Sequence, residues 1–242
     1  YRIQQKYIEY RNGIDIDNEG ITEDERNNIE SIIAKGEEIE LWDRELERIT
    51  KDESDKILEV DNFELKGNLH DFVELENEVK SCRNCNLCQN RTNTVFGCGN
   101  KNAKIMFIGE GPGADEDREG LPFVGKAGKL MDMAFQGLGI KREEVYICNI
   151  VKCRPPNNRT PLKEEANACL NYLRVQVMEV KPKIIVLLGN TALKNILSDE
   201  LGITSARGKW IEKKDIYYMP TFHPAALLRD CLLYTSPSPR DS

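Results

Sequence analysis

Short apolar runs alternate with amphipathic stretches through the second half of the chain. The runs are rich in β-formers, as in buried strands, and the longer stretches between them are typical of helices. We expect strands at 104–108, 145–150 and 183–188, and a hairpin or strand pair formed by 210–211 and 216–219. We expect helices near 125–137 and 161–179, and a shorter one after Asn190. Strands that alternate with helices predict an α/β fold with a parallel sheet covered on both faces.

The first third of the chain has a different pattern. Residues 22–50 predict a charged helix, because a capping box at Thr22 precedes an apolar stripe from Ile39 to Ile49 at spacings of three and four. Such a stripe is suited to packing against a neighbouring helix. Residues 51–68 are polar and rich in Asp, as in a linker, and a short helix at 72–79 is expected to follow.

Charge also divides the chain. The 242 residues carry a formal net charge of −7, which argues against nucleic acid as a partner, since phosphates are bound by Lys and Arg. Residues 1–79, however, hold 24 acidic and 10 basic side chains (−14), whereas residues 80–242 hold 17 and 24 (+7). The two parts are therefore interpreted separately. No run approaches the roughly 20 apolar residues of a membrane span, and no signal peptide is indicated.

The cysteines all lie after residue 80, at 82, 85, 88, 98, 148, 153, 169 and 231. Without a secretory segment we expect a reducing, intracellular compartment, where clustered cysteines indicate metal binding rather than disulfides. The Cys82-x-x-Cys85 pair, with Cys153 and Cys169, is suited to an iron–sulfur cluster or to zinc. A thioredoxin motif is not indicated, because the cysteine pair precedes the first expected strand instead of following one. A ferredoxin motif is not indicated either, because Thr92 stands where its fourth Cys would be. We expect Cys148 to be a buried apolar residue.

Three loops are expected at the carboxyl ends of the strands, where parallel sheets bind ligands: 109–124, 149–160 and 220–229. The first formally matches the dinucleotide pattern GxGxxA, so a Rossmann-type site is an alternative. Pro112 and Gly113 at the expected helix start, and three carboxylates at 115–117, argue against it. We interpret the segment as a rigid loop that places carboxylates near a reaction centre, followed by Phe123, whose ring could fill the core or stack on a base.

The other two loops carry polar and basic side chains. Asn149 offers a donor and an acceptor side by side, which matches the N3–H and O4 edge of uracil. Its loop also contains candidate phosphate ligands, Lys152, Arg154 and Arg159. His223 is one of two histidines in the chain, and the Pro224 that follows it is suited to the first turn of a short helix.

Taken together and in this order, the motifs GEGPGADED, LPFVGKAG, NIVKCRPPNNR and FHPAALLR, with the four cysteines, resemble the family 4 uracil-DNA glycosylases over about residues 79–229. The resemblance implies a three-layer αβα sandwich around a four-stranded parallel sheet. It implies a [4Fe–4S] cluster held by Cys82, Cys85, Cys153 and Cys169. It also implies that the protein flips uracil out of single- or double-stranded DNA and hydrolyses the N-glycosidic bond.

The resemblance assigns roles to single residues. Phe123 would stack on uracil, Asn149 would read its edge and reject cytosine, and His223 would hydrogen-bond uracil O2 as charge develops. Gly111 and Asn158 would line the substrate pocket. The helix beginning at Pro224, with Leu227, Leu228 and Arg229, would contact DNA as a wedge.

The residue that positions the attacking water stays open between Glu110 and Glu116, because Gly111 stands where another branch of the superfamily has Asp. A covalent mechanism through a loop histidine is disfavoured, because residues 154–160 contain no His.

The expected organisation is an acidic, mainly helical extension of unknown role at 1–78, a glycosylase domain at 79–230, and a read-through tail at 231–242. The missing initial Met suggests that the beginning is absent. We expect a cytoplasmic monomer that does not bind membranes. The alternative function is a catalytically inactive iron–sulfur module that binds nucleic acid.

Overall fold

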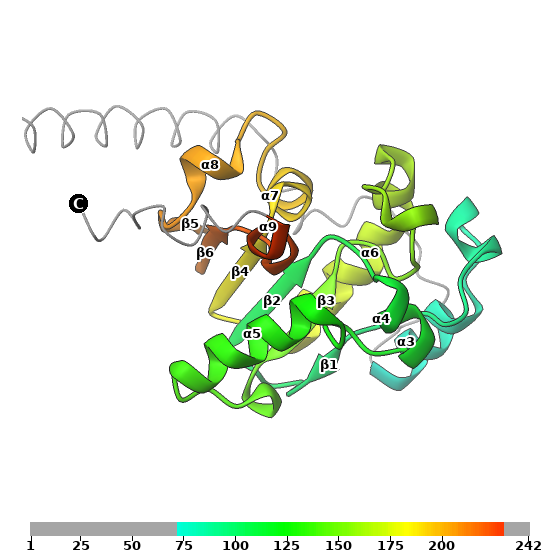
Figure 1. Cartoon of the computed structure of the whole chain (residues 1–242), viewed down its shortest axis with the longest axis horizontal. Coiled ribbons are helices and arrows are strands. Elements are labelled where there is room, and N and C mark those ends of the chain that lie inside the picture. Colours follow the sequence, from blue (N-terminus) through cyan, green and yellow to red (C-terminus); the bar gives the residue numbers. More distant parts are fainter. Residues whose placement is uncertain (1–71, 230–242) are drawn as a thin grey trace, which may run out of the picture. The chain divides into compact units, whose positions relative to one another are not determined.

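The computed structural model describes residues 72–229, and its central element is a mixed six-stranded sheet (Figure 1). The strand order is β1-β3-β2-β4-β6-β5. The four inner strands run parallel to one another, and the edge strands β1 and β5 run antiparallel to their neighbours. The strands are β1 (Cys98–Gly99), β2 (Ile105–Gly109), β3 (Tyr146–Asn149), β4 (Ile184–Leu188), β5 (Ile211–Lys213) and β6 (Ile216–Thr221). The expected four-stranded parallel sheet is confirmed, and so is the expected hairpin, in which β5 pairs with β6; the short edge strand β1 is an addition.

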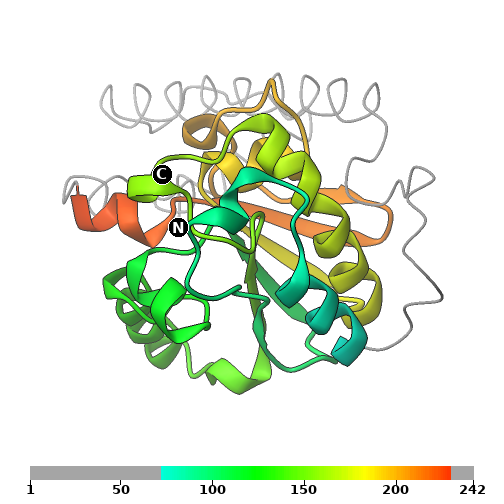
Figure 2. The same ribbon diagram turned by 90° about the vertical axis from the view of Figure 1, so that its right-hand side faces the viewer.

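Helices cover both faces of this sheet, which confirms the three-layer αβα arrangement. Helices α4, α5 and α9 lie on one side and α3 and α6 on the other (Figures 1 and 2). The α-helices are α3 (Phe72–Ser81), α4 (Ala114–Glu119), α5 (Lys126–Gly137), α6 (Lys163–Val180), α7 (Asn190–Ile196), α8 (Ile203–Ala206) and α9 (Pro224–Arg229). Short 3₁₀ turns are η1 (Asn86–Gln89), η2 (Arg142–Glu144) and η3 (Pro156–Asn158). No helix within residues 72–229 has the length and apolar character needed to cross a membrane.

The core follows from the alternation of side chains along the strands. In β2, Met106 and Ile108 are fully buried, whereas the alternate residue Phe107 packs its ring against Phe135 of α5, with the centroids 5.0 Å apart. On the other face, α3 buries Phe72, Leu75 and Val79, as its three-and-four spacing predicts. The ring of Phe72 lies 5.6 Å from that of Tyr146. Helix α3 is thus part of the core, and the domain boundary expected at residue 79 falls inside it.

One segment differs from the expected loop. Residues 114–119 form α4, because the Glu116 carboxylate accepts a hydrogen bond from Gly113 N (3.1 Å) and three acidic residues favour the first turn of a helix. Pro112 and Gly113 therefore do not prevent a helix, and that part of the argument against a dinucleotide site is wrong. The helix expected at 22–50, most of the extension 1–78 and the tail 231–242 lie outside the described residues.

Candidate functional site

A cleft of about 540 Å³ lies at the carboxyl ends of the four parallel strands. The three loops predicted from the sequence all contribute to it, which confirms their convergence. A fourth segment, Gly189–Thr191 after β4, also lines the cleft and was missed, although the same strand-end rule applies to it. Of the predicted site residues, those that line the cleft are Glu110, Gly111, Glu116, Phe123, Asn149, Asn158, Arg159, His223 and Arg229.

Three of these side chains lie close together in the cleft. Asn149 is 2% exposed, and its Oδ1 has no hydrogen-bond partner among residues 72–229. The Phe123 and His223 rings lie 5.4 Å apart, centroid to centroid, and are inclined by 29°. Gly109 provides the space, because a Cβ there would lie 2.4 Å from Asn149 Oδ1 and 2.7 Å from Phe123 Cζ. An unpaired buried acceptor beside an aromatic ring is suited to a flat ligand that brings its own N–H group.

His223 is held as a neutral imidazole. Burial, with a smaller contribution from the nearby Arg229 guanidinium, lowers the pKa of His223 from 6.5 to about 4. Its Nδ1 accepts a hydrogen bond from Ala225 N (3.1 Å), so Nδ1 carries no proton and the proton lies on Nε2. The side chain is thus a neutral N–H donor in the cleft.

The two candidate glutamates occupy different environments. Glu110 lines the cleft, and its Oε2 accepts a hydrogen bond from the hydroxyl of Thr191, a residue that the sequence analysis missed. Both oxygens of Glu116 accept from backbone N–H groups, those of Gly113 on Oε2 (3.1 Å) and of Val124 (3.0 Å) and Gly125 (2.9 Å) on Oε1. The expectation that Glu116 positions water does not fit these bonds, which instead hold the turn that carries Phe123.

That turn has an unusual backbone. Phe123 has φ = +53°, a left-handed conformation that non-glycine residues seldom adopt. Gly128 of α5 packs against it so closely that a Cβ would lie 1.8 Å from Phe123 O. Arg142 donates a hydrogen bond to Pro122 O in the same turn. These contacts fix the ring of Phe123, which is 4% exposed, at the wall of the cleft.

The basic residues expected to bind phosphate are mostly engaged within the protein. Arg154 donates from Nε to Asn158 Oδ1 (2.7 Å) and so orients that amide. Arg159 forms a two-pronged ion pair with Glu165 (2.7 and 2.8 Å), which lowers the pKa of the Glu165 carboxyl. Glu165 had no predicted role, and it also accepts from Leu162 N (2.8 Å) at the start of α6. The pair therefore anchors the loop that precedes α6.

Lys152 is buried, which differs from its predicted position at the surface of the loop. The prediction that it contacts phosphate is wrong, because its side chain is 1% exposed. Its Nζ donates to Asn149 O (2.8 Å) and to Gln176 Oε1 (2.6 Å). Gln176 in turn donates to Phe96 O and to the Tyr146 hydroxyl. The lysine thus belongs to a buried polar network beneath the cleft.

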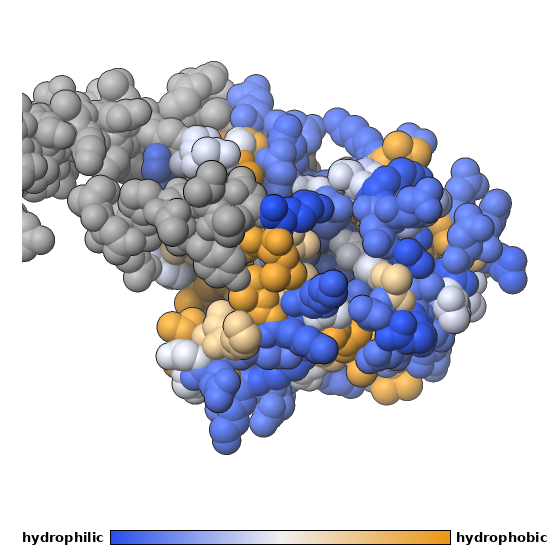
Figure 3. Space-filling view, in the orientation of Figure 1, coloured by the Kyte–Doolittle hydropathy of each residue, from blue (hydrophilic) through white to orange (hydrophobic). Residues whose placement is uncertain are grey.

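Helix α9 brings apolar side chains to the cleft rim. Pro224 is buried and starts the helix, so the expectation that it contacts DNA is wrong. Leu227 is half-buried, Leu228 is 49% exposed, and Arg229 at the end of the helix is exposed. In Figure 3 apolar surface gathers over α9, bordered by hydrophilic side chains. Leu228 is therefore better placed than Leu227 to enter a groove.

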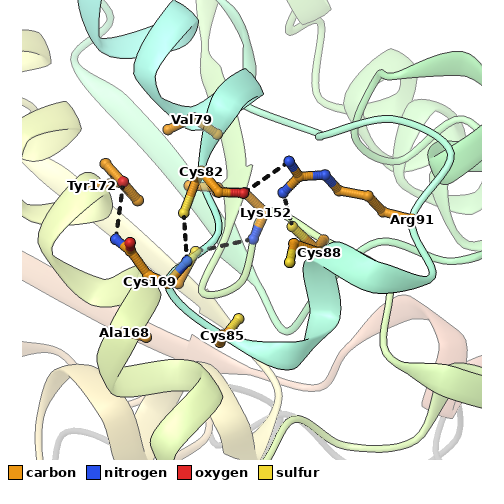
Figure 4. Close-up of a pocket in the computed structure, with 11 residues that line it drawn as sticks. Val79, Cys82, Cys85, Cys88, Arg91, Lys152, Ala168, Cys169 and Tyr172 are labelled. Carbon is orange, nitrogen blue, oxygen red and sulfur yellow. Dashed lines mark hydrogen bonds between the residues drawn. The ribbon is translucent and has the colours of Figure 1, made fainter.

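A second pocket, here called the thiol pocket, lies between α3 and α6 and contains five cysteines (Figure 4). All four predicted ligands, Cys82, Cys85, Cys153 and Cys169, line it, and so does Cys88. Within residues 72–229 no three cysteine, histidine or acidic side chains are already gathered closely enough to hold one metal ion. Cys148 lies elsewhere, fully buried in β3, which confirms its interpretation as a core residue.

The thiol pocket supplies N–H donors to its sulfur atoms. Arg91, which the sequence analysis missed, donates to Cys153 Sγ (3.1 Å), and backbone N–H groups of Lys152 and Asn84 donate to Cys169 Sγ (3.3 Å) and Cys82 Sγ (3.5 Å). Burial raises the pKa of the Cys169 thiol to about 12, opposed by the positive charge of Lys152. Four separated thiols with N–H donors around them form a suitable donor set for an iron–sulfur cluster.

Comparison with known proteins gives consistent results. A profile of the Uracil DNA glycosylase superfamily matches residues 96–237. The chain is 48% identical over 165 residues to a type-4 uracil-DNA glycosylase of Thermotoga maritima, covering 66% of this chain and 85% of that protein. It is 50% identical over 165 residues to the type-4 enzyme of Sulfurisphaera tokodaii, covering 64% and 74%. It is 43% identical over 163 residues to that of Archaeoglobus fulgidus, covering 64% and 82%.

Proposed function

This chain belongs to the uracil-DNA glycosylase superfamily, and we propose that it removes uracil from DNA by hydrolysing the N-glycosidic bond, leaving an abasic site. The observation that carries the proposal is the buried Oδ1 of Asn149, which lies beside Phe123 and has no partner among residues 72–229. Because the glycosidic bond of a stacked nucleotide is inaccessible, the uridine enters the cleft flipped out of a duplex or from a single strand.

Asn149 reads the base. Its Oδ1 accepts the uracil N3–H, and its amide N–H donates to O4. Cytosine has an acceptor at N3 and a donor at N4, so both contacts become repulsive. Discrimination by a buried polar group is strong, because the wrong base leaves that group unpaired. Phe123 supports the ring of the base at the wall of the cleft, with its own position fixed by the bonds of Glu116.

His223 stabilises the leaving base. Its Nε2–H donates to uracil O2, on which negative charge develops as the bond to the sugar breaks. A neutral donor suits this role, because it does not need to lose its proton for the base to leave. Donors of this kind lower the barrier by about 3–4 kcal/mol.

Glu110 orients the attacking water. One carboxylate oxygen is held by Thr191, and the other is available to accept a hydrogen bond from a water molecule in the cleft. An oxocarbenium-like reaction requires only weak activation of water, so a carboxylate that aligns the nucleophile is sufficient.

In this proposal the DNA lies across α9 and the rim of the cleft near Arg229. The exposed Leu228 enters the space that the flipped nucleotide leaves, and the half-buried Leu227 precedes it in the helix. Exposed Arg229 contacts a phosphate in this proposal, and Arg154 holds the amide of Asn158 at the rim.

Cys82, Cys85, Cys153 and Cys169 would hold the [4Fe–4S] cluster of the proposed enzyme. When bound, the cluster supplies a covalent cross-link that ties the loop after β3 to the CxxC segment after α3. The protein acts as a monomer in the cytoplasm in this proposal.

An excision assay tests the proposal. Single-stranded oligonucleotides of one sequence, carrying uracil, cytosine or thymine at one position, are incubated with the full chain and cleaved with alkali at abasic sites. We expect strand cleavage with uracil and none with the other two bases. Tight binding to all three strands without cleavage, by protein that contains iron, would instead indicate an inactive nucleic-acid-binding module.

A further inference from the structure

Lys152 is an unusual residue to find inside a domain. Its ammonium group is fully buried, and both of its side-chain acceptors, Asn149 O and Gln176 Oε1, are uncharged. Within residues 72–229 no carboxylate forms an ion pair with it. A buried charge without a partner is costly, so a negative group is expected nearby.

The thiol pocket is the place for that negative group. Lys152 lines this pocket together with the four predicted ligands, and its backbone N–H donates to Cys169 Sγ (3.3 Å). Figure 4 shows it beside Cys169. Four thiolates bring more negative charge than an iron–sulfur core neutralises, so the filled site is an anion. Arg91, the other cation in the pocket, donates to Cys153 Sγ (3.1 Å) as well as to Lys80 O and Cys82 O, but it is partly exposed, so Lys152 is the buried one of the two cations.

The same ammonium group reaches the reading residue. Nζ of Lys152 lies 2.8 Å from the backbone carbonyl of Asn149, the last residue of β3, whose side chain lies in the cleft. Lys152 therefore contacts the thiol pocket through its backbone N–H and the uracil-reading position through Nζ. The positive charge of its side chain also opposes the rise in the pKa of the Cys169 thiol.

We propose that Lys152 is the buried counter-charge of the iron–sulfur cluster and, through the Asn149 carbonyl, a positioning residue for uracil recognition. This inference rests on the proposed cluster. The cluster would then be linked to the active site electrostatically, through Lys152, as well as through the covalent cross-link between the two loops.

The test compares three variants of the full chain. Lys152→Met removes the charge and the donors, and Lys152→Gln removes the charge but keeps an N–H donor. Lys104→Met is the matched control, because it removes an exposed charge just before β2, at the end of that strand away from the cleft. The readouts are iron and sulfide content, the reduction potential followed by electron paramagnetic resonance, the rate of iron release to a chelator, and single-turnover uracil excision by iron-matched samples.

We expect both Lys152 variants to have a more negative reduction potential, because reduction adds negative charge that the ammonium group would stabilise. Iron release should accelerate by about tenfold or more. Excision should slow in Lys152→Met, while Lys104→Met should match the unchanged protein in every readout. An unchanged potential in both variants overturns the counter-charge role, and a shifted potential with full excision overturns the link to Asn149. If the protein without substitutions binds no iron, the cluster is refuted, and this inference with it. That result would leave the proposed excision activity untouched.

Discussion

Lowering the pH from 7.5 to 5.0 should leave uracil excision almost unchanged, because His223 stays neutral over this range. With a pKa of about 4, about 90% of the imidazole is still neutral at pH 5.0. With the ordinary value of 6.5, about 3% would be neutral, and protonation at Nδ1 would break the bond from Ala225 N. The two cases therefore predict rates that differ about 30-fold at pH 5.0.

The same shift makes stability depend on pH. The unfolded chain takes up a proton on this side chain below about pH 6.5, whereas the folded chain does so below about pH 4. Folding stability therefore falls as the pH falls between these values, and the loss at pH 5.0 is about 2 kcal/mol relative to pH 7.5. Replacement by Ala should remove this part of the pH dependence.

The assay is single-turnover excision from a single-stranded uracil oligonucleotide at pH 5.0, 6.0 and 7.5, with denaturant unfolding at the same pH values. His223→Ala should lower the rate about 100- to 1,000-fold at every pH, since it removes a donor to the developing charge. A rate in the unchanged protein that falls tenfold or more between pH 7.5 and 5.0 would refute the neutral-donor role, provided that the protein remains folded.

Three further predictions concern the Phe123 turn and the acidic extension. Glu116→Ala should destabilise the fold by about 3 kcal/mol in denaturant unfolding, because three backbone N–H groups lose their acceptor. Glu116→Gln should destabilise it less. Loss of activity in Glu116→Gln without loss of stability would instead indicate a chemical role. Gly128→Ala should displace Phe123 and lower excision at least tenfold, while Gly137→Ala in the same helix, where a Cβ meets nothing within 4 Å, should be neutral or stabilising by up to about 1 kcal/mol; equal unfolding and excision in the two variants would contradict this packing. Removing residues 1–71, which hold 21 acidic and 10 basic side chains, should tighten DNA binding most at low salt, and an affinity that is unchanged at every salt concentration would show that the extension has no electrostatic effect.

The sequence contains enough information for the layers and for the position of the cleft. Strand and helix patterns are local, and the rule that loops meet at the carboxyl ends of parallel strands brings Phe123, Asn149 and His223 together without any distance being known. The two-residue strand β1 was missed, because a run as short as Cys98–Gly99 has no periodicity to detect.

The burial of charged groups could not be predicted in the same way. Lys152 lies in a basic loop and looks like a phosphate ligand, but its acceptor Gln176 is 24 residues away in α6, where no sequence signal marks it. The roles of Glu116 and Arg159 were missed for the same reason. Glu116 accepts from the backbone N–H of Val124, and Arg159 pairs with the Glu165 carboxylate, and the folded chain brings each pair together. Side chains of this kind acquire their roles from tertiary packing.

Excision by Asn149→Asp is the most direct test of the proposed recognition of uracil. The change keeps the size of the side chain but removes the N–H group that would donate to uracil O4, and Asn102→Asp, an exposed site, adds the same charge as a control. With equal amounts of folded, iron-containing protein on one single-stranded uracil oligonucleotide, we expect Asn149→Asp to excise uracil at least about 100-fold more slowly than the unchanged chain, and Asn102→Asp not to differ from it. Equal rates for all three proteins would show that Asn149 does not read uracil.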